Sequence, residues 1–195
     1  MNPDKQLTDR WRSSELLLLG GSAGSFKILF RLVSILRPGL DKTVLIVMHR
    51  MRNHMSEIEP MFAQNSSLLL KEISDKDKIE RNAIYIAPPN YHTLIEKNGL
   101  FGLDVSEAMW FSKPSIDVTF ESAADSYPDR CTAVLFSGAN PDGAQGLLKL
   151  KQSGSLTIVQ DPAEAELPEM PLAAIKAGAA DRILKTDEIF ELLGS

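Results

Sequence analysis

The chain alternates short, continuously hydrophobic runs with longer segments in which hydrophobic residues recur every three or four positions. Continuous runs are typical of strands that a parallel sheet buries on both faces, and the longer pattern is typical of helices that cover such a sheet. The predicted strands are 16–19, 42–48, 68–73, 83–87, 131–136, 156–159 and 182–184. The predicted helices are 26–36, 114–124, 169–177 and 187–193, with two others that begin at Ser56 and after Gly143. This alternation predicts an α/β fold, a doubly wound and mostly parallel sheet flanked by helices.

One segment departs from the parallel pattern. The runs 92–96 and 100–105 flank the pair Asn98-Gly99, which is the strongest short signal for a tight turn between antiparallel strands. We therefore expect an antiparallel β-hairpin near residues 92–105.

Length and composition indicate one globular domain. The chain has 195 residues, of which 44% are hydrophobic and 24% charged. Residues 1–14 are mostly polar but include Trp11, and they are predicted to be an N-terminal tail that docks on the body of a domain spanning 15–195. The net charge of −5, without a basic cluster, argues against nucleic acid as a partner. The absence of a signal-peptide pattern or a long apolar run, together with the single cysteine, predicts a cytoplasmic protein without membrane insertion.

The segment Gly20-Gly21-Ser22-Ala23-Gly24 joins the first predicted strand to the first predicted helix. It fits the G-x-S-x-G form of a nucleophile elbow, in which small neighbours let a strained turn expose the serine at the carboxyl end of a strand. An ordinary strand-to-helix turn, with glycines for close packing, is the alternative that this stretch alone leaves open.

Two other predicted strands end in groups that complement a serine nucleophile. His49 follows the run 42–48, and Asp142 follows the run 131–136. Ligands bind at the carboxyl ends of strands in open α/β sheets, so Ser22, His49 and Asp142 could supply a nucleophile, a base and an orienting carboxylate. A satisfied loop histidine and a helix-capping aspartate are the structural alternatives. The competing residues are His54 and His92 for the base, and Asp117 and Asp161 for the carboxylate.

Other chemistries lack their signatures. The glycines at 20, 21 and 24 do not have the dinucleotide-binding spacing, and no Walker lysine follows them. The chain has no cysteine pair and no H-E-x-x-H, which argues against a zinc site. We expect neither a metal nor a cofactor.

The motifs and their order give the chain a family resemblance. From about Glu15 to the C-terminus it resembles the catalytic domain of CheB-type chemotaxis protein-glutamate methylesterases. The motifs are G-G-S-A-G at 20–24, V-M-H at 47–49, A-P-P-N-Y-H at 87–92, K-P-S-I-D at 113–117, S-G-A-N-P-D-G at 137–143, Q-D-P at 160–162 and E-M-P at 169–171.

The resemblance implies a serine hydrolase that releases methanol from glutamyl γ-methyl esters of methyl-accepting chemotaxis receptors, and that can also deamidate glutamine. It implies Ser22, His49 and Asp142 as the catalytic residues, and amides at Ala23 and Ala139 as oxyanion donors. Family members usually carry a phosphorylation-controlled receiver domain, whereas only about fourteen residues precede the motifs here. We therefore expect a separate regulatory protein as a partner.

The chain also differs from the family at the expected rim of the site. Trp110 and Phe111 stand where relatives have a glycine- and proline-rich segment, and they are candidate substrate contacts. Two alternative functions stay open at this point: a non-catalytic module that binds a receptor or scaffold through this rim, and an esterase for a different small or protein ester.

Overall fold

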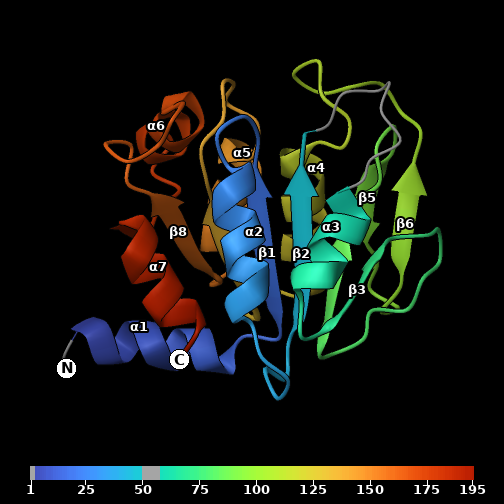
Figure 1. The fold of residues 1–195 in the computed structure, drawn as a ribbon. Coiled ribbons are helices and arrows are strands. Elements are labelled where there is room, and N and C mark those ends of the chain that lie inside the picture. Colours follow the sequence, from blue (N-terminus) through green and yellow to red (C-terminus); the bar gives the residue numbers. More distant parts are fainter. Residues whose placement is uncertain (1–2, 50–57) are drawn as a thin grey trace.

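A seven-stranded, fully parallel sheet forms the centre of the molecule (Figure 1). The structure, a computed structural model, describes residues 3–49 and 58–195. The strand order is β3-β4-β2-β1-β7-β8-β9. The strands are β1 (Leu16–Gly21), β2 (Thr43–Met48), β3 (Leu69–Glu72), β4 (Ala83–Ile86), β7 (Cys131–Leu135), β8 (Leu156–Gln160) and β9 (Arg182–Leu184). The predicted doubly wound α/β fold is confirmed.

Helices cover both faces of this sheet. Phe62 and Phe190 belong to a hydrophobic cluster on the face covered by α2, α3 and α7, and Phe120 belongs to a second cluster under α4, α5 and α6. The five inner strands, β4, β2, β1, β7 and β8, send residues into both clusters, which is why they read as continuous hydrophobic runs. The helices are α1 (Pro3–Ser13), α2 (Phe26–Ile35), α3 (Ile58–Asn65), α4 (Ile116–Ser126), α5 (Ala144–Gln152), α6 (Glu169–Lys176) and α7 (Thr186–Leu193).

The predicted antiparallel hairpin is present beside the main sheet. Strand β5 (His92–Ile95) pairs with β6 (Phe101–Asp104), from His92 opposite Asp104 to Ile95 opposite Phe101. Gly99 has a φ of +78° in the connecting turn, a conformation that glycine adopts without a steric penalty. The hairpin packs against α4, so it contributes Ile95 and Phe101 to the core.

One predicted helix start differs from the structure, and another cannot be compared with it. Helix α4 begins at Ile116 with Ser115 as its N-cap, so Pro114 precedes the helix instead of lying in its first turn. The predicted start of α3 at Ser56 lies outside the described residues.

The N-terminal residues form helix α1 instead of the polar tail that the sequence predicts. Trp11 is only 1% exposed and joins the same cluster as α7, against which α1 packs. The Lys42 ammonium lies 4.7 Å from the Trp11 ring centroid and donates to the carbonyl oxygens of Arg12 and Ser14. Among the side chains described in this mostly polar helix, Trp11 is the one fully buried anchor, and hydrophobic periodicity does not detect an isolated anchor.

The strand order reverses direction between β1 and β7. The chain proceeds from β1 to β2 and β4 on one side, and from β7 to β8 and β9 on the other. At such a switch point the connections leave a crevice at the carboxyl ends of the strands. The ends of β2, β1 and β7 are therefore adjacent, and each is followed by one of the three predicted site residues.

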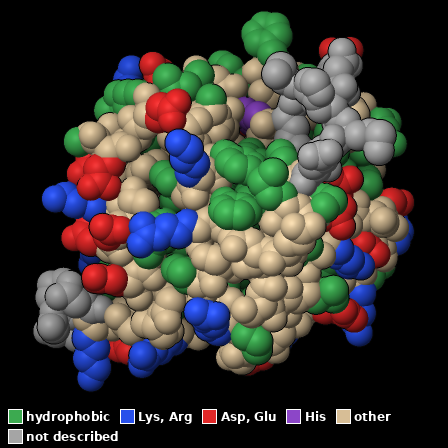
Figure 2. Space-filling model, viewed as in Figure 1, with side chains coloured by type: hydrophobic (Ala, Val, Ile, Leu, Met, Phe, Trp, Pro, Cys, Tyr) green, Lys and Arg blue, Asp and Glu red, His purple; other side chains and the backbone are tan. Residues whose placement is uncertain are grey.

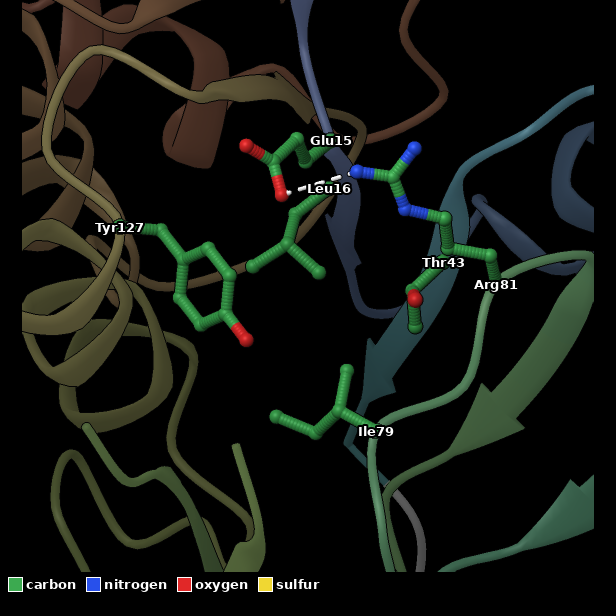
Figure 3. Close-up of a pocket in the computed structure, with 6 residues that line it drawn as sticks. All are labelled: Glu15, Leu16, Thr43, Ile79, Arg81 and Tyr127. Carbon is green, nitrogen blue, oxygen red and sulfur yellow. Dashed lines mark hydrogen bonds and ion pairs between the residues drawn. The ribbon is translucent and has the colours of Figure 1, made fainter. Parts of the chain in front are cut away.

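A small hollow lies at the opposite end of the same strands (Figure 3). It is lined in part by Leu16 and Thr43, which begin β1 and β2, and Glu15 forms an ion pair with Arg81 across it. The remaining lining residues, Ile79 and Tyr127, add no nucleophile. This hollow is separate from the carboxyl ends of the strands and does not belong to the candidate site.

Replacing Trp11 by alanine tests whether α1 is part of the folded domain. We expect Trp11→Ala to lower the free energy of unfolding by about 3 kcal/mol, because a fully buried indole is lost together with its cation–π contact. Urea unfolding measures the change, with Arg12→Ala, an exposed neighbour, as the control. A loss equal to that of the control would show that α1 does not contribute to stability.

Candidate active site

Ser22 lies directly after β1, in a turn that holds its backbone close to the β7 exit. Its N–H donates to the Ser137 carbonyl oxygen at 2.9 Å, and its own carbonyl accepts from the Ser25 hydroxyl. A Cβ added to Gly138 would lie 3.1 Å from the Ser22 Cβ, so glycine there permits this close approach. The left-handed residue of the turn is Gly24, with a φ of +84°, and Ser22 itself does not have a positive φ.

His49 and Asp142 form a short hydrogen-bonded pair across the sheet. The His49 Nε2 lies 2.7 Å from the Asp142 Oδ2, although 93 residues separate the two in the chain. His49 follows β2, and its backbone N–H lies 3.4 Å from the Gly21 carbonyl oxygen. A carboxylate can only accept, so Nε2 carries the proton and Nδ1 of the neutral ring carries a lone pair. The Nδ1 atom is therefore available as a base.

Asp142 is fully buried at the N-terminus of α4. Its carboxylate accepts from the Ile116 N–H at 2.7 Å, the Asp117 N–H at 3.0 Å and the Ser115 hydroxyl at 2.8 Å. Burial raises the pKa of Asp142, but the hydrogen bonds from His49 and the two amides outweigh it and hold the pKa below its usual range. Both amides belong to the first turn of α4, where the helix dipole favours a negative charge.

The structural alternative for Asp142 was a cap on the following helix. The N-cap of α5 is Gly143, which makes no side-chain cap, and Asp142 instead satisfies amides of α4. The carboxylate is thus a cap on a helix from a different part of the chain, and it also binds His49.

Asp117 lies next to this pair but has a different role. Its carboxyl accepts from the Gly146 N–H at 2.8 Å and makes no hydrogen bond to His49 among the described residues. Burial raises the pKa of Asp117 to about 6, and the nearby charge of Asp142 adds to this rise. Asp117 therefore joins α4 to α5 as a carboxyl that is hard to ionise.

The two other competing residues that the structure describes, Asp161 and His92, have partners of their own. Asp161 accepts from the Ala163 N–H in its own turn. His92 is buried between the Glu107 carbonyl oxygen and the Ser115 N–H, 2.8 and 3.1 Å from its ring nitrogens, so it is a structural histidine that supports the loop before α4. His54 lies outside the described residues.

Sequence reasoning missed two serines at this site. Ser115 binds Asp142, and the S-I-D pattern before a predicted helix could have identified it as an N-cap. The Ser112 hydroxyl lies 3.2 Å from the His49 Nδ1, and no sequence signal marks it. The Ser22 hydroxyl makes no hydrogen bond to His49 or to any other residue within 3–49 and 58–195.

The expected oxyanion donors and rim residues are all accessible. Ala23 and Ala139 are exposed, and neither amide donates to another residue in the described part of the chain. Trp110 is 49% exposed and Phe111 is completely exposed, two residues and one residue before Ser112. Figure 2 shows a histidine side chain reaching the surface near the top of the molecule, below a projecting hydrophobic side chain.

No metal or membrane feature accompanies this arrangement in the part of the chain that the structure describes. Over residues 3–49 and 58–195, no group of three or more His, Cys, Asp and Glu side chains could hold a metal ion. None of the helices described there combines the length and apolar character needed to cross a membrane.

Comparisons with known proteins agree with the motifs. Residues 17–193 match the family model described as "CheB methylesterase". A Leptospira interrogans protein named "Putative protein-glutamate methylesterase/protein-glutamine glutaminase" is 39% identical over 91% of this chain and 92% of its own length. A protein-glutamate methylesterase/protein-glutamine glutaminase of Symbiobacterium thermophilum is 28% identical, but the chain spans only 49% of its length. The crystal structure of the Thermotoga maritima CheB methylesterase catalytic domain superposes with a TM-score of 0.87 at 28% identity, over 93% of this chain and 98% of that one.

The raised pKa of Asp117 predicts a pH-dependent stability difference between the wild type and Asp117→Asn. In the wild type, the stability that Asp117 contributes is present below pH 4 and is lost as the pH rises through about 6, because the unfolded carboxyl ionises more readily. Asparagine does not ionise and keeps an acceptor for Gly146. Urea unfolding should therefore show that Asp117→Asn gains about 2–3 kcal/mol relative to the wild type between pH 4 and pH 7. An equal difference at both pH values would contradict the raised pKa.

Proposed function

Because this chain belongs to the CheB methylesterase family, we propose that it is a serine hydrolase that cleaves glutamyl γ-methyl esters and releases methanol. The substrate is a helical segment of a methyl-accepting chemotaxis receptor. Deamidation of glutamine in the same segment would proceed through the same acyl-enzyme, with ammonia in place of methanol.

One observation supports this proposal most strongly. The exits of β2, β1 and β7, adjacent in the sheet, carry His49, Ser22 and Asp142, and the His49–Asp142 hydrogen bond measures 2.7 Å. A hydroxyl, an imidazole and a buried carboxylate at neighbouring strand ends are the groups that acyl transfer requires.

In the proposed reaction, the Ser22 hydroxyl oxygen attacks the ester carbonyl carbon while the His49 Nδ1 takes its proton. The tetrahedral intermediate then breaks its bond to the methoxy oxygen, and the imidazolium returns the proton so that methanol leaves. Water enters, loses a proton to Nδ1 and attacks the acyl carbon. The bond to the Ser22 oxygen then breaks, the imidazolium returns its proton to that oxygen, and the glutamate is freed.

Asp142 supports the reaction through His49. It holds the ring in the tautomer that leaves Nδ1 unprotonated, and its negative charge stabilises the imidazolium that forms in each half of the reaction. The hydrogen bond from His49 and those from the α4 amides lower the pKa of this carboxylate despite its complete burial, which favours the ionised form. The same amides fix its position, so the base does not depend on a flexible side chain.

The amides of Ala23 and Ala139 are the proposed oxyanion donors. Both belong to the loops that follow β1 and β7, on the two sides of the switch point, and both lack a partner among the described residues. A donor aimed at the developing negative charge contributes about 3 kcal/mol of transition-state stabilisation. Trp110 and Phe111 are the proposed substrate rim.

Replacing Ser22 by alanine tests the nucleophile. We expect Ser22→Ala to reduce methanol release from a methylated receptor by at least about 10³-fold, because the acyl-enzyme cannot form. The far-ultraviolet circular dichroism and the urea midpoint should stay close to the wild type. Ser34→Ala, in which a hydroxyl bonded within α2 is lost, is the matched control and should retain full activity.

Measurements on Ser22→Ala and on the wild type together separate the proposed function from its alternatives. Retained methanol release in Ser22→Ala would contradict the proposed nucleophile. Receptor binding without methanol release and without phosphonylation of wild-type Ser22 by a fluorophosphonate would favour a non-catalytic binding module. Turnover of short esters, but not of a methylated receptor, would favour a different ester substrate.

A further inference from the structure

The lone pair on His49 Nδ1 is already engaged by a serine other than the proposed nucleophile. Asp142 binds Nε2, so Nδ1 is the nitrogen left to accept a proton from Ser22. The Ser112 hydroxyl lies 3.2 Å from this Nδ1 and 3.4 Å from the Trp110 carbonyl oxygen, so its one proton is shared between two acceptors, of which the Nδ1 of the neutral ring is the nearer. Ser112 and Ser22 must therefore compete for one acceptor.

Ser112 is held in this position by a very short hairpin, Met109–Ser112. The Met109 N–H donates to the Ser112 carbonyl at 3.1 Å, and the Ser112 N–H donates to the Met109 carbonyl at 2.7 Å. Trp110 and Phe111 form the two-residue tip, and the Trp110 carbonyl oxygen lies 3.4 Å from the Ser112 hydroxyl. A displacement of the tip is thus transmitted directly to Ser112.

The two aromatic residues at the tip adopt a backbone conformation that is unusual for aromatic residues. Trp110 and Phe111 have φ values of +51° and +61°, and two consecutive positive φ values define a turn that favours Asn-Gly. Aromatic residues are poorly suited to this conformation. The Phe111 side chain projects completely into solvent, and Trp110 is 49% exposed, with its side chain hydrogen-bonded to the Asp117 carboxyl. The hydrophobic core therefore accounts for neither aromatic ring. An apolar surface from outside the chain would account for both features.

We propose that the Met109–Ser112 hairpin is a substrate-displaced latch. In the free enzyme, Ser112 occupies the His49 Nδ1 and keeps it from Ser22. The apolar face of the methylated receptor helix packs against Trp110 and Phe111, moves the hairpin and releases Nδ1. Ser112 is a positioning residue in this scheme, and it favours protein esters over small esters that cannot engage the tip. The inference rests on the proposed function, because it takes Ser22 as the nucleophile.

The first test measures how fast a small fluorophosphonate, which does not reach the hairpin tip, modifies Ser22. The modified peptide is identified by mass spectrometry. We expect Ser112→Ala to react about threefold to tenfold faster than the wild type, which is the effect of losing one competing hydrogen bond. Ser112→Thr keeps the hydroxyl and should stay closer to the wild type. Ser106→Ala, which removes a nearby hydroxyl bonded to Asp104, is the control for the loop.

The outcomes of this test are distinguishable. A rate for Ser112→Ala equal to or below that of the wild type, with Ser22 still labelled, overturns the latch and leaves the proposed function intact. If Ser112 only supported the structure of the loop, Ser112→Ala would react more slowly than the wild type. Labelling of Ser112 instead of Ser22, or no labelling of any variant, contradicts the nucleophile and the latch together.

The second test addresses the tip. The double variant Trp110→Asn/Phe111→Gly supplies the residues that the turn prefers and removes both aromatic side chains. We expect it to react with the fluorophosphonate no faster than the wild type, but to release methanol from a methylated receptor at least several-fold more slowly. Adding Ser112→Ala to the double variant should recover part of this loss. Methanol release at the wild-type rate in the double variant overturns the latch.

Discussion

The buried carboxylate of Asp142 connects three parts of the molecule that are remote in sequence. It follows β7, it accepts the first amides of α4, and it binds the ring of His49 at the end of β2. Removing a charge from water is costly, and here four hydrogen bonds and a helix N-terminus compensate for that cost. The position of the histidine therefore depends on how α4 is packed against the sheet.

This arrangement has a chemical consequence for the imidazole. With Nε2 committed to a carboxylate, every proton that enters or leaves the ring during the proposed reaction must use Nδ1. The Ser112 hydroxyl, and not the Ser22 hydroxyl, is bound to that atom. The free enzyme thus has an assembled histidine–carboxylate pair whose basic nitrogen is engaged, and the loop that engages it also carries the most exposed aromatic side chain of the described chain.

Much of the fold could be predicted from the sequence, because continuous hydrophobic runs identify strands and the Asn98-Gly99 pair identifies the hairpin. The proximity of His49 and Asp142 could be predicted as well, because the carboxyl ends of parallel strands lie at one edge of the sheet. Trp11 indicated that the N-terminal segment docks on the domain, but its helical structure was not predicted, because the segment is mostly polar and has too few hydrophobic residues to establish a periodicity. The contact between Ser112 and His49 could not be predicted either, because it depends on the path of an irregular loop in the folded chain.

The protonation of His49 is the most direct test of this account. Nitrogen-15 and proton NMR of histidine-labelled protein at pH 7 should show a strongly downfield proton attached to Nε2, with Nδ1 unprotonated. Asp142→Asn should abolish the downfield shift, because the charged acceptor is lost. A proton on Nδ1, or a downfield signal that survives in Asp142→Asn, would contradict the claim that Asp142 orients His49 as the base.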